Sequence, residues 1–400
     1  MMRACLALLA VCVLPPSASA QPATAESKGV VERAKHAYEV LFTKPVRLSL
    51  EPIAPTAGVT AGIGLKPKPW RSGSIFKLLE GRASISSNTY WAVDGSFAWQ
   101  GVGDKEWRIE PYARFRSMKR LNYFGLGNDS EVDDRADFAM LDRRVGAYAY
   151  RRPVGWLALG TRAEAMWPRT AAGQDDELSS IDETFTVIPG FGLPTNYLYL
   201  GTFANVNYPY VRSERPRRGG DYVASVAWFS DMSGTKSSFR RVEIEGQERF
   251  TIAGRDRVLT IHGRMSSSVA RSGHVVPFYL MDTLGGADNL RGFKEAIIGS
   301  DETTSTLRSF ESFRFRDAAS ALIQVEFRQR IYSQMFLSAF FDAGAVASTV
   351  RAISDAKFRK GAGVGLNIYK VNALAVRAEL SIWGGEGHPR YFTPGRGLAF

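Results

Sequence analysis

The chain has 400 residues, of which 45% are hydrophobic and 12% aromatic, with 38 glycines. The formal net charge of +11 suits an anionic lipid surface or a cationic lumen. Its two cysteines, Cys5 and Cys12, both precede residue 21, so disulfide and thiol chemistry is excluded for the rest of the chain.

Residues 1–20 have the pattern of a secretory signal peptide. Arg3 precedes an apolar run over residues 4–14, and small residues end the segment at Ala18-Ser19-Ala20. The run is too short to cross a bilayer as a helix, so we expect cleavage after Ala20 rather than an anchor. An N-terminal core helix is the alternative. A nucleic-acid partner is not expected for an exported chain.

Residues 21–44 are predicted to form a periplasmic segment with one amphipathic helix over residues 26–42. Its apolar side consists of Val30, Ala34, Tyr38 and Leu41. An isolated helix must bury such a stripe, so we expect it to plug the barrel mouth or to lie on the membrane. The alternative is a frayed leader.

From residue 45 the hydrophobic period changes from helical to two. In residues 321–332 the apolar positions are Ala321, Ile323, Val325, Phe327 and Ile331. They alternate with Gln324, Glu326, Arg328 and Arg330. Residues 373–383 repeat the pattern, with Arg377 and Glu379 on the polar side. Charges on one face alone are typical of a membrane barrel with a lipid-facing wall and a wet lumen.

The sequence therefore predicts an all-β protein, a transmembrane antiparallel β-barrel of about 16 strands over residues 45–400. The other candidate strands cover residues 58–65, 83–100 (one and a half strands), 107–118, 137–150, 155–167, 197–208, 222–230, 239–252, 257–267, 336–346, 361–369 and 390–400. Aromatic residues such as Trp91, Trp156 and Trp228 are candidates for the interfacial girdles of such a barrel.

One segment, residues 270–319, lacks the strand pattern although it separates two good strands. A loop of this length in a compact barrel is usually functional or disordered. It contains Leu284-Gly285-Gly286 followed by Leu290-Arg291-Gly292-Phe293. These residues resemble the loop-six signature of the BamA/TamA superfamily of outer-membrane barrels, of the bacterial surface antigen type. The resemblance implies that the long loop folds into the lumen.

In that family the arginine of the loop tip pairs with acidic residues on the next two strands. The candidates here are Glu326 and Asp342, the latter in Phe340-Phe341-Asp342-Ala343-Gly344, which is similar to the family's F-x-D-x-G element. Strand alternation places both carboxylates on the lumen side. We expect Arg291 to form charge-assisted hydrogen bonds with them, Gly292 to allow a tight turn and Phe293 to pack the tip.

The chain ends with Leu398 and Phe400 on one strand face. This terminal aromatic strand resembles the signal by which barrels are recognised for assembly; a plain last strand is the alternative. Residues 123–128, Tyr-Phe-Gly-Leu-Gly-Asn, also look like an element common in these barrels. The resemblance is strongest over residues 284–400.

Catalysis, cofactors and metals find little support in the sequence. The four histidines, His36, His262, His274 and His388, lack ligand spacing, and there is no G-x-S-x-G or H-E-x-x-H motif. A barrel hydrolase built around His262 is the enzymatic alternative.

By resemblance, the expected function is insertion, assembly or translocation of outer-membrane polypeptides or lipids in the bacterial outer membrane. Expected partners are outer-membrane lipids, lipopolysaccharide and unfolded outer-membrane protein clients. The gate would lie between the strand at residues 58–65 and the strand ending at Phe400, since unpaired edges recruit strands. One departure stands out: only residues 21–44 precede the predicted barrel, so the family's POTRA repeats are not expected. The alternative is a passive pore or structural barrel.

Overall fold

The computed structural model of the 400-residue chain describes residues 45–49, 52–54, 56–101, 106–208, 219–252, 256–286, 308–332, 334–370, 373–386 and 390–394. Two predicted features, the signal peptide and the helix at residues 26–42, lie outside these ranges.

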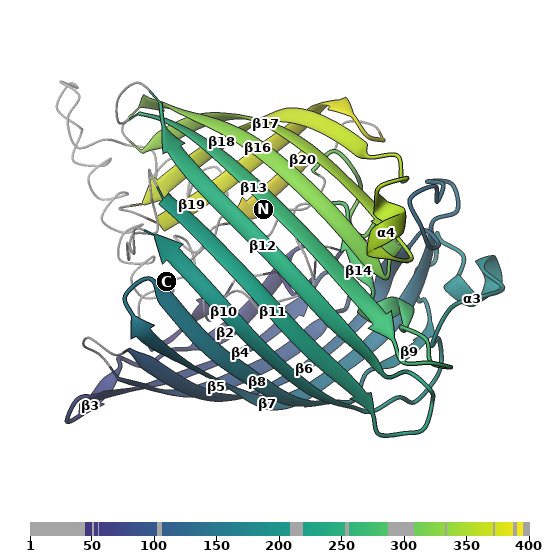
Figure 1. The fold of residues 1–400 in the computed structure, drawn as a ribbon, viewed down its shortest axis with the longest axis horizontal. Coiled ribbons are helices and arrows are strands. Elements are labelled where there is room, and N and C mark those ends of the chain that lie inside the picture. The colour runs from purple at the N-terminus through teal and green to yellow at the C-terminus, as the bar shows by residue number, and fades with distance from the viewer. Residues whose placement is uncertain are drawn as a thin grey trace, which may run out of the picture.

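One large antiparallel sheet contains most of the described residues (Figure 1). Its strands are β1 (Val46–Ser49), β2 (Thr60–Leu65), β3 (Trp70–Ser72), β4 (Ile75–Ser86), β5 (Trp91–Gly101), β6 (Trp107–Tyr123), β7 (Ala136–Val154), β8 (Leu157–Met166), β9 (Arg169–Ala172), β10 (Tyr197–Tyr208), β11 (Gly219–Asp231), β12 (Phe239–Thr251), β13 (Arg257–Ala270), β16 (Ala319–Tyr332), β17 (Met335–Ala347), β18 (Arg359–Lys370), β19 (Ala373–Gly384) and β20 (Arg390–Pro394). A separate pair of short strands, β14 (Asp282–Leu284) and β15 (Phe315–Asp317), belongs to the long loop after β13.

In the large sheet, each strand pairs antiparallel with the previous and the next passage of the chain through the wall, as in an up-and-down barrel. β2 and β3 both pair with β4, and β8 and β9 both pair with β7, so each of these couples is one pass of the chain. The 18 strands of the sheet in the described residues therefore make about 16 passes, and an even number is typical of single-chain membrane barrels. The predicted all-β transmembrane barrel is confirmed.

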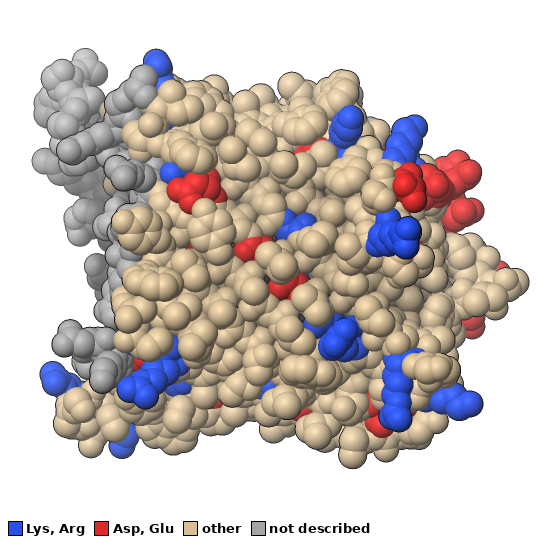
Figure 2. Space-filling view, viewed as in Figure 1, with Lys and Arg blue, Asp and Glu red and all other residues tan. Residues whose placement is uncertain are grey.

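Side chains alternate between the outer face and the lumen along these strands. In β16, Ile323 is 46% and Ile331 54% exposed, whereas Gln324 and Arg328 between them are buried. The predicted alternation for this strand is thus confirmed. Figure 2 shows the result on one face: most of the outer wall is uncharged, and most charged side chains lie toward its two ends.

One strand prediction needs correction at the start of the barrel. β1 precedes the strand at residues 58–65 and pairs with it, Val46 lying opposite Leu65, so that strand is the second and not the first. The four residues of β1 are too few to show a clear alternation. The one and a half strands predicted for residues 83–100 are the end of β4 and most of β5, joined at a turn where Thr89 has a φ of 59°.

The even number of passes places the start of β1 and the end of β20 at one end of the barrel. The opposite end, called the loop end here, bears the short helices α3 (Ile181–Thr184) and α4 (Val350–Ile353), on the right in Figure 1. None of the helices in the described ranges is long and apolar enough to cross a membrane. Counted along the chain, the loop between β13 and β16 is the sixth at the loop end.

Candidate functional site

The sixth loop is described on both sides of its middle, as residues 271–286 and 308–318. The two sides pair as β14 and β15, with Thr283 opposite Arg316. Arg291, Gly292 and Phe293 fall in the gap, outside the described residues, so the pairing predicted for Arg291 stays a prediction.

Arg308, at the second side of the gap, lies deep in the lumen with a side chain that is 2% exposed. Its Nε donates to Asp342 Oδ2 at 2.8 Å and its Nη2 to Asp342 Oδ1 at 2.6 Å, a bidentate fork. Its Nη1 donates to Glu326 Oε2 at 2.7 Å and to Glu379 Oε1 at 2.9 Å. Loop six is thereby attached to three strands, β16, β17 and β19.

Two more arginines balance the charge of these carboxylates. Arg377 donates to Glu326 Oε2 at 2.8 Å and to Glu379 Oε1 at 2.6 Å, and Arg328 Nε lies 3.8 Å from Glu326 Oε1. The ring of Phe340 lies under Arg308, with the guanidinium carbon 3.8 Å from the ring centroid. We call Arg308, Arg328, Arg377, Glu326, Asp342 and Glu379 the loop-six lock. Removing one member of such a buried network leaves an uncompensated charge, which typically costs about 3–5 kcal/mol.

In the structure, Glu326 and Asp342 lie close together in the lumen, and both accept hydrogen bonds from Arg308. The sequence interpretation missed this arginine, although a signal for it exists. Leu307-Arg308-Ser309-Phe310 has the same L-R-x-F spacing as the segment around Arg291, with serine in place of glycine. The sequence prediction selected the segment around Arg291 because it contains the glycine of the family signature.

Ser309 shows how closely this second copy fits. Its Oγ accepts a hydrogen bond from Ser381 Oγ at 2.6 Å, and a Cβ added to Gly361 would lie 1.9 Å from it. The Ser309 side chain therefore approaches β18 so closely that only glycine fits at position 361. Serine at position 309 adds polar contacts that glycine could not make.

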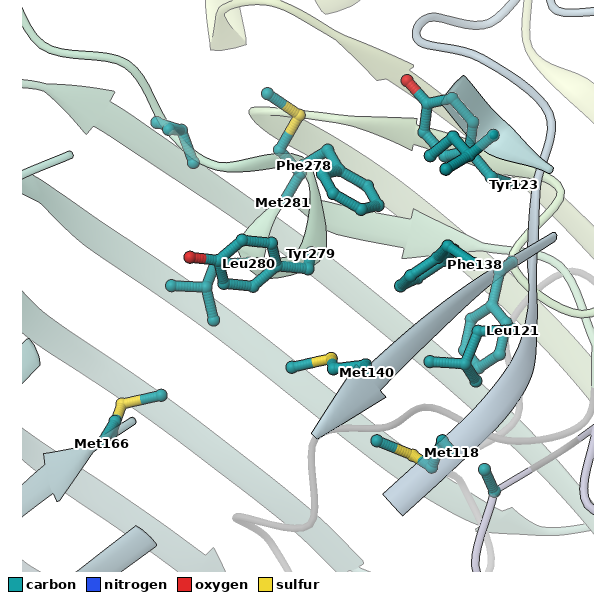
Figure 3. Packing of buried hydrophobic residues seen from close by; sticks show 14 of the residues in the cluster. Met118, Leu121, Tyr123, Phe138, Met140, Met166, Phe278, Tyr279, Leu280 and Met281 are labelled. Carbon is teal, nitrogen blue, oxygen red and sulfur yellow. The ribbon is translucent and has the colours of Figure 1, made fainter. Parts of the chain in front are cut away.

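Nearer the loop end, the first side of loop six closes the lumen with apolar side chains. The short helix Phe278–Leu280 and Met281 after it are buried, and Phe278 is 0% exposed. Figure 3 shows Phe278 facing Phe138 and Tyr123 of the barrel wall; their ring centroids lie 4.8 and 5.3 Å away. Burial raises the pKa of the Tyr279 phenol, so it stays neutral. We call residues 276–281, together with the wall residues Tyr123 and Phe138, the mouth seal.

Two buried arginines attach this seal to the rest of the molecule. Arg316 of β15 donates to the Phe278 carbonyl at 2.8 Å. Arg241 of β12 donates to the Leu280 carbonyl and to Ser268 Oγ, and lies against the rings of Phe229 and Phe239. Arg241 supplies a donor to a carbonyl at the end of the short helix, where intrahelical donors run out. The Phe278 carbonyl accepts from Arg316 in addition to the Met281 amide.

A third arginine joins loop six to two other loops across the mouth. Arg314 Nε donates to both carboxylate oxygens of Glu386 in the β19–β20 loop, at 2.6 and 2.8 Å, and Arg314 Nη1 donates to Ser130 Oγ of the β6–β7 loop at 2.7 Å. The predicted element at residues 123–128 ends here: Asn128 accepts from the Val346 amide, and its side chain donates to the Lys357 carbonyl. We call the contacts of Arg314 with Ser130 and Glu386 the mouth clasp.

The histidines of the described residues serve hydrogen bonding. His262 lies in the lumen between Gln324 Oε1 at 2.8 Å and Glu245 Oε1 at 2.7 Å, and His274 accepts from the Ser238 amide at 3.0 Å. No group of three or more potential metal ligands occurs within the described part of the chain. His36, His388, Leu398 and Phe400 lie outside it.

Comparison with protein families matches residues 212–371 to the Omp85 superfamily domain. This span runs from just before β11 to the end of β18 and includes loop six and its carboxylates Glu326 and Asp342. No curated protein matches the chain in sequence.

Solved structures are similar to the chain at low sequence identity. CdiB from Escherichia coli is 12% identical with a TM-score of 0.50, covering 90% of this chain and 69% of that one. BamA from Haemophilus ducreyi, lacking POTRA domains 1–3, is 16% identical with a TM-score of 0.48, covering 92% and 75%. CdiB from Acinetobacter baumannii is 10% identical with a TM-score of 0.47, covering 84% and 55%.

Proposed function

We propose that the chain, an outer-membrane β-barrel whose residues 212–371 match the Omp85 superfamily domain, takes part in inserting or translocating outer-membrane polypeptides or lipids. The observation that carries this proposal is the loop-six lock. It attaches a loop that enters the lumen to β16, β17 and β19, close to the end of the barrel sheet.

The lock supports this function because it connects β16 and β17 to β19, the strand that pairs with the last strand, β20. A barrel whose first and last strands separate exposes backbone donors and acceptors that can pair with a client strand. Such a barrel needs an internal brace, since the strands flanking an opened junction lose one neighbour. Arg308 fills this role with four side-chain hydrogen bonds to carboxylates on three strands.

The mouth seal bears on the route of a client. Phe278, Tyr123 and Phe138 fill the loop end of the lumen with closely packed rings, so straight passage through this end would require the seal to move. A lateral route through the wall requires no such movement. We therefore place the proposed exchange at the junction of the first and last strands.

The proposal is tested with the full chain folded into liposomes. An unfolded model outer-membrane barrel is added, and its insertion is followed by heat-modifiable mobility on gels. We expect insertion several-fold faster than into empty liposomes, and slower insertion with Arg308→Ala. If the protein-bearing liposomes insert the client no faster than empty ones, the proposal is wrong.

A matched pair of variants decides which arginine holds loop six. Arg308→Ala removes the guanidinium that the lock contains, and Arg291→Ala removes the one in the L-R-G-F copy. We expect a large loss of folded barrel for Arg308→Ala and a small effect for Arg291→Ala. The reverse order would assign the role to Arg291.

A structural or passive barrel is the second candidate, and the same samples test it. The mouth seal favours the closed, structural form of this candidate over an open pore. Absent client insertion together with low conductance in planar bilayers would support a structural barrel, whereas absent insertion with steady conductance would support a pore.

A further inference from the structure

Far from the lock in sequence, the lumen wall formed by β4 to β7 carries a group of charges in which arginines outnumber carboxylates. Asp94 of β5 is bonded by three guanidinium groups: Arg82 Nη2 at 2.7 Å, Arg114 Nε at 3.1 Å and Arg116 Nη2 at 3.3 Å. We call these four residues the Asp94 cluster. Their side chains are only 13–20% exposed.

In two other groups of lumenal charges, the carboxylates are at least as numerous as the arginines. Arg264 contacts both Glu243 and Asp282, and Arg308 contacts three carboxylates. In the Asp94 cluster, by contrast, Arg114 and Arg116 share the single oxygen Oδ1 of Asp94. Arg82 makes a further interaction, so we count the excess positive charge on Arg114 and Arg116 alone.

The strand register increases the imbalance. Arg114 lies between Asp94 on one side and Arg144 on the other, directly across from each. Like charges directly opposite each other on neighbouring strands are destabilising. Arg116 lies opposite Asp142, but both oxygens of Asp142 accept from Arg144 Nε, at 2.7 and 2.8 Å.

Arg116 also has an unused donor within this cluster. Its Nε is buried and has no hydrogen-bond partner in the described residues. A partly buried cation without full compensation is costly, and in a lumen the missing charge can be supplied by a bound anion. The nearby titratable groups on the same wall are Glu80, which pairs with Lys66, and Glu164, which Arg162 and Arg144 share.

From this arrangement we propose that Arg114 and Arg116 form a lumenal binding site for a phosphate group. The two residues are two positions apart on β6 and so point to the same side, where two planar guanidinium groups can each present a fork to one tetrahedral oxyanion. Arginine is well suited to phosphate for this reason, and rings of arginine are a known means of attracting anions in pores. Bound phosphate also separates the charges of Arg114 and Arg144.

The test uses the full chain folded in detergent micelles. The midpoint temperature for loss of the heat-modifiable band is measured during titration with inorganic phosphate, and with chloride at equal ionic strength. We expect phosphate to raise the midpoint more than chloride does. Glycerol 3-phosphate is titrated in a second series. A dissociation constant lower than that of inorganic phosphate would indicate a headgroup-borne phosphate, and a higher one would indicate the free anion.

Arg116→Gln is expected to weaken the apparent affinity for phosphate at least tenfold. Without phosphate, its midpoint should equal or exceed that of the original chain, because one of several like charges is removed. A merely structural role of Arg116 would instead lower this midpoint. Arg114→Gln serves as a second variant with the same expectation. Arg240→Gln, an exposed arginine on the outer face of β12, is the matched control and should keep phosphate binding unchanged.

Three results would overturn the proposal. One is a phosphate effect no larger than that of chloride, and another is full phosphate affinity in both Arg114→Gln and Arg116→Gln. The third is failure of both variants to fold without phosphate, since the proposal requires that removing either charge relieves repulsion.

Discussion

Asp342 makes more contacts with loop six than the other two carboxylates around Arg308. Both of its oxygens accept from the Arg308 side chain, and Oδ2 also accepts from the Arg308 backbone amide at 3.0 Å. Its side chain is 0% exposed. Glu326 and Glu379 each accept one bond from Arg308, and both also bond Arg377. The three carboxylates are therefore not equivalent.

This difference leads to a prediction for two isosteric variants. Asp342→Asn replaces the carboxylate, which accepts from three donors of Arg308, by a neutral amide. Because this breaks a buried ion-pair network from one side, the free energy of unfolding should fall by about 3–5 kcal/mol. Glu379→Gln should cost less, because Glu326 still accepts from both arginines. The free energy of unfolding in urea, measured in lipid vesicles, gives the ranking. Equal losses for the two variants would contradict the geometry described here.

At the scale of elements, the mouth seal depends on one short helix. Phe278 contacts the rings of Tyr123, Phe138 and Tyr279 at centroid distances of 4.8–5.5 Å. Since it is fully buried, Phe278→Ala should cost about 3–5 kcal/mol through lost burial and a cavity.

The same variant should also open the loop end to small solutes. We expect higher conductance in planar bilayers and faster swelling of liposomes in sugar solutions. Phe250→Ala is the control, because Phe250 is 45% exposed on the outer face of β12 and makes no part of the seal. Similar conductance in both variants would show that Phe278 does not close the lumen.

The mouth clasp gives a prediction about coupling between distant loops. Arg314 is 3% and Glu386 24% exposed, so their ion pair is shielded from solvent. A double-mutant cycle of Arg314→Gln and Glu386→Gln should give a coupling free energy of about 1–3 kcal/mol.

An exposed ion pair at the same mouth provides the comparison for this cycle. Arg135 and Glu311 lie 3.4 Å apart with exposures of 38% and 36%, and exposed pairs contribute about 0.2–1 kcal/mol. Only the Arg135–Glu311 coupling should fall markedly in 0.5 M salt. A clasp coupling no larger than this one would mean that Arg314 does not join the loops.

Sequence reasoning succeeded where local alternation determines the structure. The faces of β16 follow from its period of two, because one face meets lipid and the other water. It missed Arg308, because the role of this residue depends on contacts distant in sequence. The L-R-x-F spacing of residues 307–310 does not by itself show that the segment binds the carboxylates. The fit of Ser309 against Gly361 and Ser381 appears only when the strands are assembled. The pairing predicted for Arg291 stays a prediction.

For the whole molecule, the decisive property is that every strand separates lipid from lumen. Ile244 at the centre of β12 points outward and is 54% exposed, between Ala224 and Met265 of the adjacent strands. Ser225 of β11 points inward, opposite Glu243. The two residues lie on adjacent strands but on opposite faces of one wall.

Arginine placed at these two positions should therefore act very differently. Ile244→Arg introduces a charge into the hydrocarbon region, which typically costs about 2–4 kcal/mol near the bilayer midplane. Ser225→Arg places the same side chain beside the carboxylate of Glu243 in the lumen and should leave stability nearly unchanged or improve it. Unfolding in urea from vesicles measures both. Equal destabilisation would mean that the two positions share one environment, which is incompatible with a barrel wall at this register.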